Sequence, residues 1–326
     1  MTLASATEPG ADRAARARAL VRPFADEYPF TGRWIEVDGV ALHLIDEGPR
    51  DAPPLLLLHG NPTWSFLWRR LVRALSATWR VVALDHAGCG LSDKPQAYPY
   101  MLDRHVANVE EVVRELDLRD LTLVLHDWGG AIGMGFARRH PERVARLVLM
   151  NTAAFRSQRM PLRIRVCRVP GFGPFAVRGL GGFARGTVRM ASARPLTPGA
   201  RLGFLAPYGT WRDRVANLAF VRDIPLEPGH PSWDELVAIE EGLEQFRDRP
   251  TCILWGMRDW CFTPACLDKF RELIPQARVH RFEDAGHWVL EEAPEQIIAL
   301  VEDFLADTPV NRTRPLDRVI ATRNVR

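Results

Sequence analysis

The chain has 326 residues, of which 47% are hydrophobic and 25% charged, a composition that is typical of a globular protein with one large core or two modest domains and excludes fibrous and disordered chains. Its net charge is +3, but arginines in residues 1–22 and 307–326 carry that excess. The body between these tails is slightly acidic, so we expect no continuous positive surface and no nucleic-acid partner.

Cysteine usage and apolar runs bear on the location of the protein. Its cysteines are odd in number and lack the spacing of a zinc site; they are Cys89, Cys167, Cys252, Cys261 and Cys266. Residues 1–20 lack the apolar core of a signal peptide, and no run approaches the roughly 18 to 20 apolar residues of a transmembrane helix. We therefore expect a cytoplasmic protein without metal or cofactor, whose contact with a membrane can only be peripheral.

The strand signals begin with residues 33–48, which alternate apolar and polar side chains around Asp38-Gly39, a dipeptide typical of a type I′ hairpin turn. Short, continuous apolar runs follow, and such runs are typical of strands that are buried on both faces. They read PPLLLLHG, RVVALDHAGCG, LTLVLHDWGG, RVARLVLMNTAA, TCILWGMRD and RVHRFEDAGH.

Helical periodicity separates these runs. The predicted amphipathic helices are 66–77, 103–117, 130–140, 264–274 and 294–306. Alternating strands and helices predict an α/β fold with an eight-stranded, mostly parallel, doubly wound sheet, whose functional residues gather at the carboxyl ends of the strands.

One segment breaks this alternation. Residues 155–245 show no strand pattern and are rich in Gly, Pro and aromatic residues, so we interpret them as an inserted helical cap, or lid. The predicted organisation is then an N-terminal extension (1–29), a core (30–154 and 246–306), the cap, and a basic C-terminal tail (307–326).

Asp127 lies in HDWGG, between a predicted strand and a predicted helix. A glycine-rich turn at this place is typical of a nucleophile elbow, which holds a reactive side chain above the sheet. In most proteins of this design the elbow residue is serine, but an aspartate needs no deprotonation to attack and forms an ester that can later be hydrolysed. Asp127 could equally serve as a helix cap, and the segment alone does not decide between the two.

Two residues late in the chain are candidate partners of Asp127. His287, in EDAGHW, could activate water, and Asp259, in LWGMRDW, could orient the imidazole ring and stabilise its charged form. Alone, each is as typical of an ordinary loop or turn. Together, three such residues in the order Asp, Asp, His, each at the end of a strand, match the chain order of α/β-hydrolase triads.

The segment HGNPTW (59–64) follows the first predicted parallel strand, where backbone N–H groups form part of an oxyanion hole in this architecture. Asn61 could offer its backbone N–H and side-chain amide, and Trp128 its backbone and indole N–H groups. Trp128 could instead be a core aromatic residue, although a buried indole N–H needs a partner.

These segments together resemble the α/β-hydrolase superfamily and, more narrowly, the haloalkane dehalogenases, over roughly residues 30 to 306. The resemblance implies that Asp127 is the nucleophile, His287 the base and Asp259 the acid, and that Asn61 and Trp128 bind the leaving group. It is carried by HGNPTWSFLWR, DHAGCGLSDKP, HDWGG and GHWVLEEAPE.

The choice of acid narrows the resemblance further. One dehalogenase subfamily takes a glutamate acid from the end of the preceding strand, but that place here reads MNTAAF, so Asn151 cannot serve and Asp259 must. An aspartate acid with an Asn/Trp pair is the pattern of the third dehalogenase subfamily. The segments NTAAF and APYGTWRDRVANLAFVRDIPL resemble members of that subfamily that act as β-lactone decarboxylases in long-chain olefin biosynthesis.

This resemblance implies conversion of a cis-3,4-dialkyl-β-lactone to a cis-alkene and CO2. It also implies a long-chain apolar substrate and assembly with a β-lactone synthetase and other enzymes of that pathway. Haloalkane dehalogenation uses the same five residues and stays open as an alternative. Epoxide hydrolases share HDWGG but use two lid tyrosines, whereas this cap holds only Tyr208, so epoxide opening is disfavoured. A non-catalytic binding module would be favoured by loss of a triad residue, but all three are present.

Overall fold

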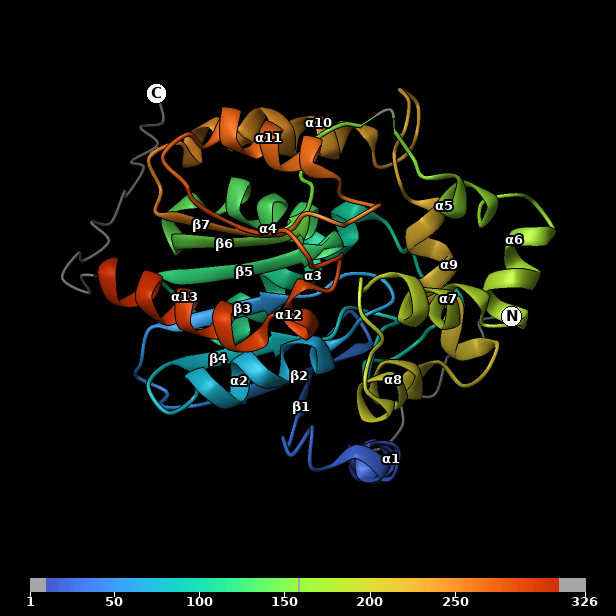
Figure 1. Cartoon of the computed structure of the whole chain (residues 1–326). Helices are drawn as coiled ribbons and strands as arrows, with labels where there is room; N and C mark the ends of the chain where they lie inside the picture. The colour runs from blue at the N-terminus through green and yellow to red at the C-terminus, as the bar shows by residue number, and fades with distance from the viewer. Residues whose placement is uncertain (1–9, 158, 311–326) are drawn as a thin grey trace, which may run out of the picture.

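A twisted sheet of eight strands forms the centre of the molecule, in the order β1-β2-β4-β3-β5-β6-β7-β8 (Figure 1). It comes from a computed structural model of the chain, in which residues 10–157 and 159–310 are described. The strands are β1 (Arg33–Val37), β2 (Val40–Glu47), β3 (Pro54–Leu58), β4 (Arg80–Leu84), β5 (Leu121–Asp127), β6 (Val144–Thr152), β7 (Thr251–Gly256) and β8 (Arg278–Phe282).

Strand pairing confirms the predicted mostly parallel sheet. β2 pairs antiparallel with β1 and β4, and all the other neighbours pair parallel. The turn between β1 and β2 is the predicted one, because Val37 pairs with Val40 and both Asp38 and Gly39 have positive φ angles (48° and 76°), as a type I′ turn requires.

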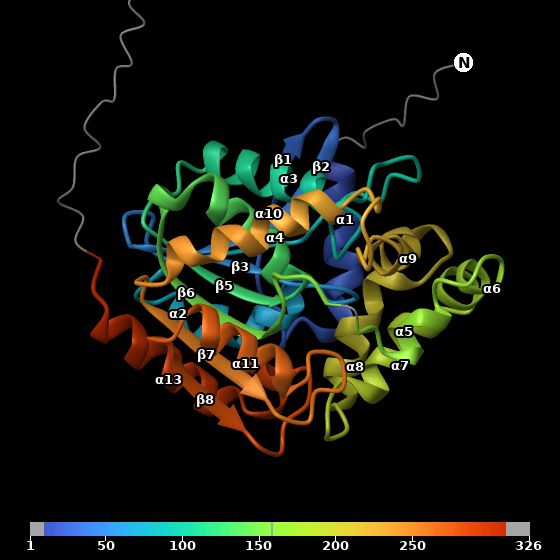
Figure 2. The same ribbon diagram turned by 90° about the horizontal axis from the view of Figure 1, so that it is seen from above.

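Helices cover both faces of the sheet, which is why the inner strands are mostly apolar. In β3, Leu56 and Leu58 face one layer of helices, while Leu55 and Leu57 face the other. The first layer is formed by α3 (Leu102–Glu115), α4 (Trp128–Arg139), α10 (Trp233–Gly242) and α11 (Pro264–Leu273) (Figure 2). The second is formed by α2 (Arg69–Leu75), α12 (Val289–Glu292) and α13 (Pro294–Asp307).

Each of the five predicted helices has a counterpart in these layers. The segment predicted as 66–77 is a 3-10 turn, η2 (Ser65–Trp68), followed by α2. The helix predicted from residue 130 begins two residues earlier, at Trp128, because the backbone of Asp127 bends abruptly and leaves no intervening loop.

The segment between β6 and β7 is helical and, among its described residues, contains no strand. Its remaining elements are α5 (Leu162–Val166), α6 (Phe172–Pro174), the π-helix η4 (Phe175–Gly179), α7 (Gly182–Met190), α8 (Pro198–Leu205), η5 (Ala206–Tyr208), η6 (Arg212–Arg214), α9 (Val215–Arg222) and η7 (Leu243–Phe246). Most of them lie over one end of the sheet (Figure 1), whereas α10 packs against α3 and α4. We therefore propose that the cap ends before α10.

Outside these layers, the described part of the chain begins with a helix that the sequence patterns do not indicate, α1 (Gly10–Val21), followed by η1 (Arg22–Phe24). Arg13 in α1 pairs with Asp93 at 3.2 Å and so ties this helix to the loop after β4. The short turn η3 (Pro141–Arg143) leads from α4 into β6. Across residues 10–157 and 159–310, no helix combines the length and apolarity needed to span a membrane.

Candidate active site

Asp127 occupies a sharp turn between β5 and α4. Its φ and ψ angles are 52° and −128°, a conformation that a non-glycine residue adopts only when its surroundings enforce it. Gly129 and Gly130 leave room for the turn: a Cβ atom would lie 1.9 Å from the Leu58 carbonyl oxygen in the first case and 1.8 Å from Thr152 Oγ1 in the second. The Asp127 side chain makes no helix-capping hydrogen bond, so the geometry favours the elbow interpretation over the cap.

The two carboxylate oxygens of Asp127 have different surroundings. Oδ1 accepts a hydrogen bond from the Asn61 backbone N–H at 2.7 Å, and the Trp128 backbone N–H also donates to the carboxylate. Oδ2 lies 3.6 Å from His287 Nε2. Burial raises the pKa of Asp127 above its ordinary value, although His287 and the two N–H donors oppose this shift. One oxygen is thus held in place while the other faces the imidazole.

His287 lies in the loop between β8 and α12. Its Nδ1 is 2.8 Å from Asp259 Oδ2, and its backbone N–H donates to the Ala191 carbonyl at 2.7 Å. Burial alone would lower the pKa of His287, but the carboxylates of Asp259 and Asp127 outweigh it and raise the pKa above its ordinary value. The imidazole is therefore held in one orientation between two carboxylates.

Asp259 follows β7 and is itself held by hydrogen bonds. Its Oδ1 accepts from the Cys261 backbone N–H at 2.7 Å, and its Oδ2 accepts from Asn151 Nδ2 at 3.0 Å. Asn151, at the end of β6, also exchanges hydrogen bonds with both backbone groups of Gly256. The sequence excludes Asn151 as the acid but does not indicate this positioning contact, because only the pairing of β6 with β7 places Asn151 beside Asp259.

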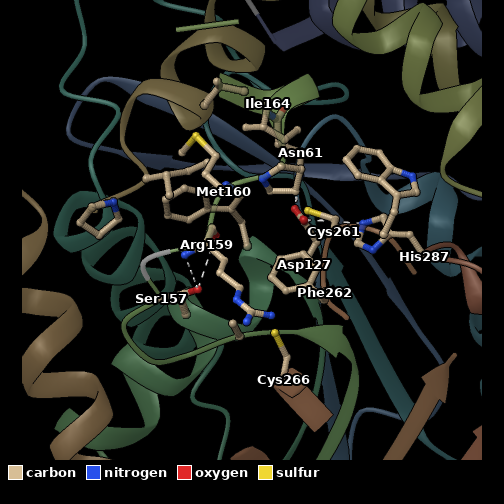
Figure 3. Close-up of a pocket in the computed structure, with 18 of the residues that line it drawn as sticks. Asn61, Asp127, Ser157, Arg159, Met160, Ile164, Cys261, Phe262, Cys266 and His287 are labelled. Atoms are coloured by element: carbon tan, nitrogen blue, oxygen red, sulfur yellow. Dashed lines mark hydrogen bonds and ion pairs between the residues drawn. The ribbon is translucent and has the colours of Figure 1, made fainter. Parts of the chain in front are cut away.

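Asn61 and Trp128 both border the site. The Asn61 side chain donates to the Asn217 carbonyl of α9 at 3.0 Å, so this amide joins the loop after β3 to the cap. Trp128 is half-buried and packs on Phe220, with 5.2 Å between the ring centroids. Asn61, Asp127, Trp128 and His287 therefore border one cavity, and Figure 3 shows Asn61, Asp127 and His287 close together in it. Asp259 lies outside the cavity wall and reaches the site through its contact with His287.

A cavity of about 1160 Å³, counting the part that is open to solvent, begins at the Asp127 carboxylate. Asn61, Asp127, Trp128 and His287 form its base. Apolar side chains dominate the rest of its wall, among them Phe155, Met160, Pro161, Ile164, Phe183, Val221, Ile224, Pro225, Leu236, Trp260 and Phe262. An apolar cavity above a buried carboxylate suits an alkyl-bearing substrate that the carboxylate attacks.

The residues of this site do not form a metal-binding group. Within residues 10–157 and 159–310, no cluster of three or more His, Cys, Asp or Glu side chains could hold a metal ion. Cys261 borders the cavity, and burial raises its thiol pKa well above the ordinary value. Asp127 is therefore the best-placed nucleophile at the base of the cavity.

Comparisons with known proteins agree with this architecture. Residues 53–294 match the family model for the alpha/beta hydrolase fold. A haloalkane dehalogenase from Agrobacterium tumefaciens has a similar structure, with a TM-score of 0.77 and 29% sequence identity over 85% of this chain and 97% of that one.

Curated relatives have two kinds of named activity. The chain is 39% identical to a cis-3-alkyl-4-alkyloxetan-2-one decarboxylase of Shewanella oneidensis, over 89% of this chain and 94% of the relative. It is 38% identical to the same enzyme of Xanthomonas campestris, over 87% and 98%. It is 31% identical to haloalkane dehalogenase 2 of Mycobacterium tuberculosis, over 85% and 96%.

Proposed function

The chain belongs to the α/β hydrolase fold family, and within that family we propose that it is a β-lactone decarboxylase, which converts cis-3-alkyl-4-alkyloxetan-2-ones to cis-alkenes and CO2. The observation that carries this proposal is its 38–39% identity, over nearly the whole chain, to two relatives named for that activity. The site supports it, because a buried carboxylate faces a large apolar cavity.

We assign the roles as follows. Asp127 is the nucleophile, His287 and Asp259 support it, and Asn61 with Trp128 binds the carboxylate that the lactone ring releases. His287 at 3.6 Å from Asp127 and 2.8 Å from Asp259 can share its positive charge with anions on the substrate. Asn151 is a positioning residue that acts through Asp259.

A displacement mechanism fits this geometry. Asp127 Oδ2 attacks C4 of the lactone from the side opposite to the ring oxygen; the C4–O bond breaks, and its electron pair stays on the freed substrate carboxylate. That carboxylate leaves as CO2, the electrons of its C–C bond form the double bond between C3 and C4, and Asp127 leaves as a carboxylate. Inversion at C4 followed by anti elimination converts a cis-lactone to a cis-alkene, and no water is consumed.

Haloalkane dehalogenation is the second candidate, favoured by the structural likeness to a dehalogenase and by the 31% identical relative. In that reaction Asp127 displaces halide, and water activated by His287 hydrolyses the alkyl ester at the carbonyl carbon. The same residues are used, but water is consumed and its oxygen atom enters the Asp127 carboxylate.

The deciding experiment incubates purified protein with a cis-3,4-dialkyl-β-lactone or with a 1-bromoalkane, in water enriched in ¹⁸O. We expect alkene and CO2 from the lactone, without ¹⁸O in Asp127. If the protein instead releases bromide, gains ¹⁸O in Asp127 and forms no alkene from the lactone, its function is dehalogenation and the proposed function is wrong. Asp127→Ala is the control for uncatalysed ring opening.

The same proposal extends to location and partners. We infer a cytoplasmic enzyme in peripheral contact with a membrane, where a long-chain lactone is concentrated, and assembled with the enzymes that make this lactone. The apolar lining of the cavity supports a long-chain substrate.

A further inference from the structure

The large apolar side chains that are exposed on the described part of the chain all lie in one segment. Their exposed fractions range from 39% for Val166 to 72% for Leu162. The set consists of Leu162, Val166, Val169, Phe172, Phe175, Leu180, Met190, Leu202 and Trp211. Scattered exposed apolar residues are normal, but their confinement to one segment marks an interaction surface.

The same segment has an extreme charge distribution. Residues 156–212 contain eleven arginines and no aspartate, glutamate or lysine. Among the described residues, only Arg156 of these eleven forms an ion pair with a carboxylate, that of Glu240. The slightly acidic balance of the body as a whole does not reveal this local concentration of positive charge in the cap.

We call the exposed apolar residues between Leu162 and Trp211, with the arginines among them, the basic cap surface. The elements α6, η4, α7 and α8, which carry many of them, contact one another. Arg178 stacks over the Trp211 ring at 4.7 Å, and Arg163 donates to Met190 Sδ at 3.5 Å. At Gly179, a Cβ atom would lie 3.5 Å from Phe175 and 3.6 Å from Trp211. Figures 1 and 2 show α6 at the outer edge of the molecule, on the side away from the sheet.

The basic cap surface lies on the outside of the cavity wall. In α5, Ile164 is buried and lines the cavity, whereas Leu162 and Val166 on either side of it are exposed. In α7, Phe183 and Thr187 line the cavity, whereas Arg185 and Arg189 are exposed. The same short helices therefore separate the cavity from this surface.

We propose that the basic cap surface docks the enzyme on an anionic lipid bilayer, so that long-chain substrate can pass from the bilayer into the cavity. Arginines without carboxylate partners attract anionic headgroups, and the phenylalanine, leucine and tryptophan side chains between them enter the interface. A nucleic acid would use the arginines but would leave this apolar area uncovered. This proposal rests on the proposed function only for the identity of the substrate that enters from the bilayer. Docking itself does not depend on turnover.

The test measures binding of the full chain to vesicles of phosphatidylcholine with and without phosphatidylglycerol, by co-sedimentation at low and high salt. We expect binding that requires phosphatidylglycerol and weakens with salt. Arg165→Gln, Arg185→Gln and Arg189→Gln together should weaken it by roughly a hundredfold, at about fivefold for each arginine. The double variant Phe172→Ser, Phe175→Ser should weaken it by about tenfold or more.

A matched control removes the same charge at the opposite end of the molecule, with Arg114→Gln, Arg119→Gln and Arg247→Gln, near the amino ends of β5 and β7. We expect this variant to bind vesicles like the unmodified chain. The proposal would be overturned if both triple variants bound vesicles equally weakly. It would also be overturned if the cap variants kept full vesicle binding through the basic tails.

Turnover of a short-chain lactone that is free in solution separates this proposal from the proposed function. The cap variants should keep that activity, because none of the replaced residues lines the cavity. If the unmodified chain does not turn over the short-chain lactone, that result would contradict the decarboxylase assignment, but it would not affect the vesicle result. Failure to bind vesicles with normal turnover would contradict the docking surface alone.

Discussion

The Nε2 atom of His287 lies 3.6 Å from Oδ2 of Asp127, and both side chains are buried. The two groups stabilise each other's charged forms, and this relationship makes the chemistry of one residue measurable through the other. A water molecule or substrate atom that lies beside this pair can be within hydrogen-bonding distance of both side chains.

Replacing the nucleophile gives the first prediction. Asp127→Ala should lower turnover of a β-lactone by about a thousandfold or more, because water cannot replace a positioned carboxylate. Asp127→Asn should also lower the pKa of His287, since the Asp127 charge contributes to raising it. NMR titration of the imidazole measures that pKa, and an unchanged value would show that the two groups do not interact.

The second prediction separates the two candidate reactions through His287. On a 1-bromoalkane, His287→Gln should release about one bromide per active site and then stop, because hydrolysis of the ester needs the base. On a β-lactone, the same variant should continue to turn over, at a rate lower by roughly ten- to a hundredfold, because decarboxylation consumes no water. Intact-protein mass spectrometry would show a stable adduct only after bromoalkane; steady bromide release would contradict the proposed order of steps.

The third prediction concerns pH. A raised pKa keeps the His287 imidazole protonated to higher pH than an ordinary histidine, and a raised pKa of Asp127 delays its ionisation. The rate of decarboxylation should therefore be highest between the pKa of Asp127 and the pKa of His287. It should fall as the pH drops below the pKa of Asp127, and it should fall by roughly tenfold as the pH rises above the pKa of His287. Ester hydrolysis needs neutral imidazole and should instead rise there. Rate profiles with both substrates would distinguish these opposite slopes.

Much of the fold could be predicted from the sequence because the local sequence patterns agree with the burial of the same residues in the structure. Asp38-Gly39 determines the hairpin, and the continuous apolar runs allow only strands covered on both faces. Helix α1 was missed because alanine and arginine alternate along it without a clear apolar face. The position of α10 on α4 depends on distant contacts, which a linear pattern does not contain.

The candidate site was predictable to a similar degree. Asp127 ends β5, while Asp259 and His287 follow β7 and β8, and parallel strands bring their carboxyl ends to one edge. The contact of Asn151 with Asp259, and the bond from the Asn61 side chain to the cap, arise from register and from loop conformation. Neither has a sequence motif of its own, so the structure was needed to find them.

Asn151 gives the fourth prediction. Asn151→Ala removes a hydrogen bond to Asp259 and two to Gly256, and should cost about 1–3 kcal/mol of unfolding free energy and roughly tenfold in turnover. Without this donor, the Asp259 carboxylate should interact more strongly with the imidazolium and raise the pKa of His287 further, which an imidazole NMR titration can detect. Asn217→Ala is the matched control, because that buried side chain has no hydrogen-bond partner among the described residues and should cost less. An unchanged His287 pKa would limit Asn151 to a structural role.

The last prediction concerns the length of the alkyl chains. If the apolar wall of the cavity receives both alkyl arms, each buried CH2 adds up to about 0.8 kcal/mol, or roughly fourfold in kcat/KM, until the cavity is full. A series of cis-β-lactones with arms from methyl upward, kept below their micelle concentrations, measures this increment. Phe183→Ala, in the cavity wall, should reduce kcat/KM for the long members more than for the short ones, whereas Phe175→Ala, outside the wall, should not. A flat series, or one that is highest for the shortest lactone, would contradict a long-chain substrate and favour a small haloalkane instead.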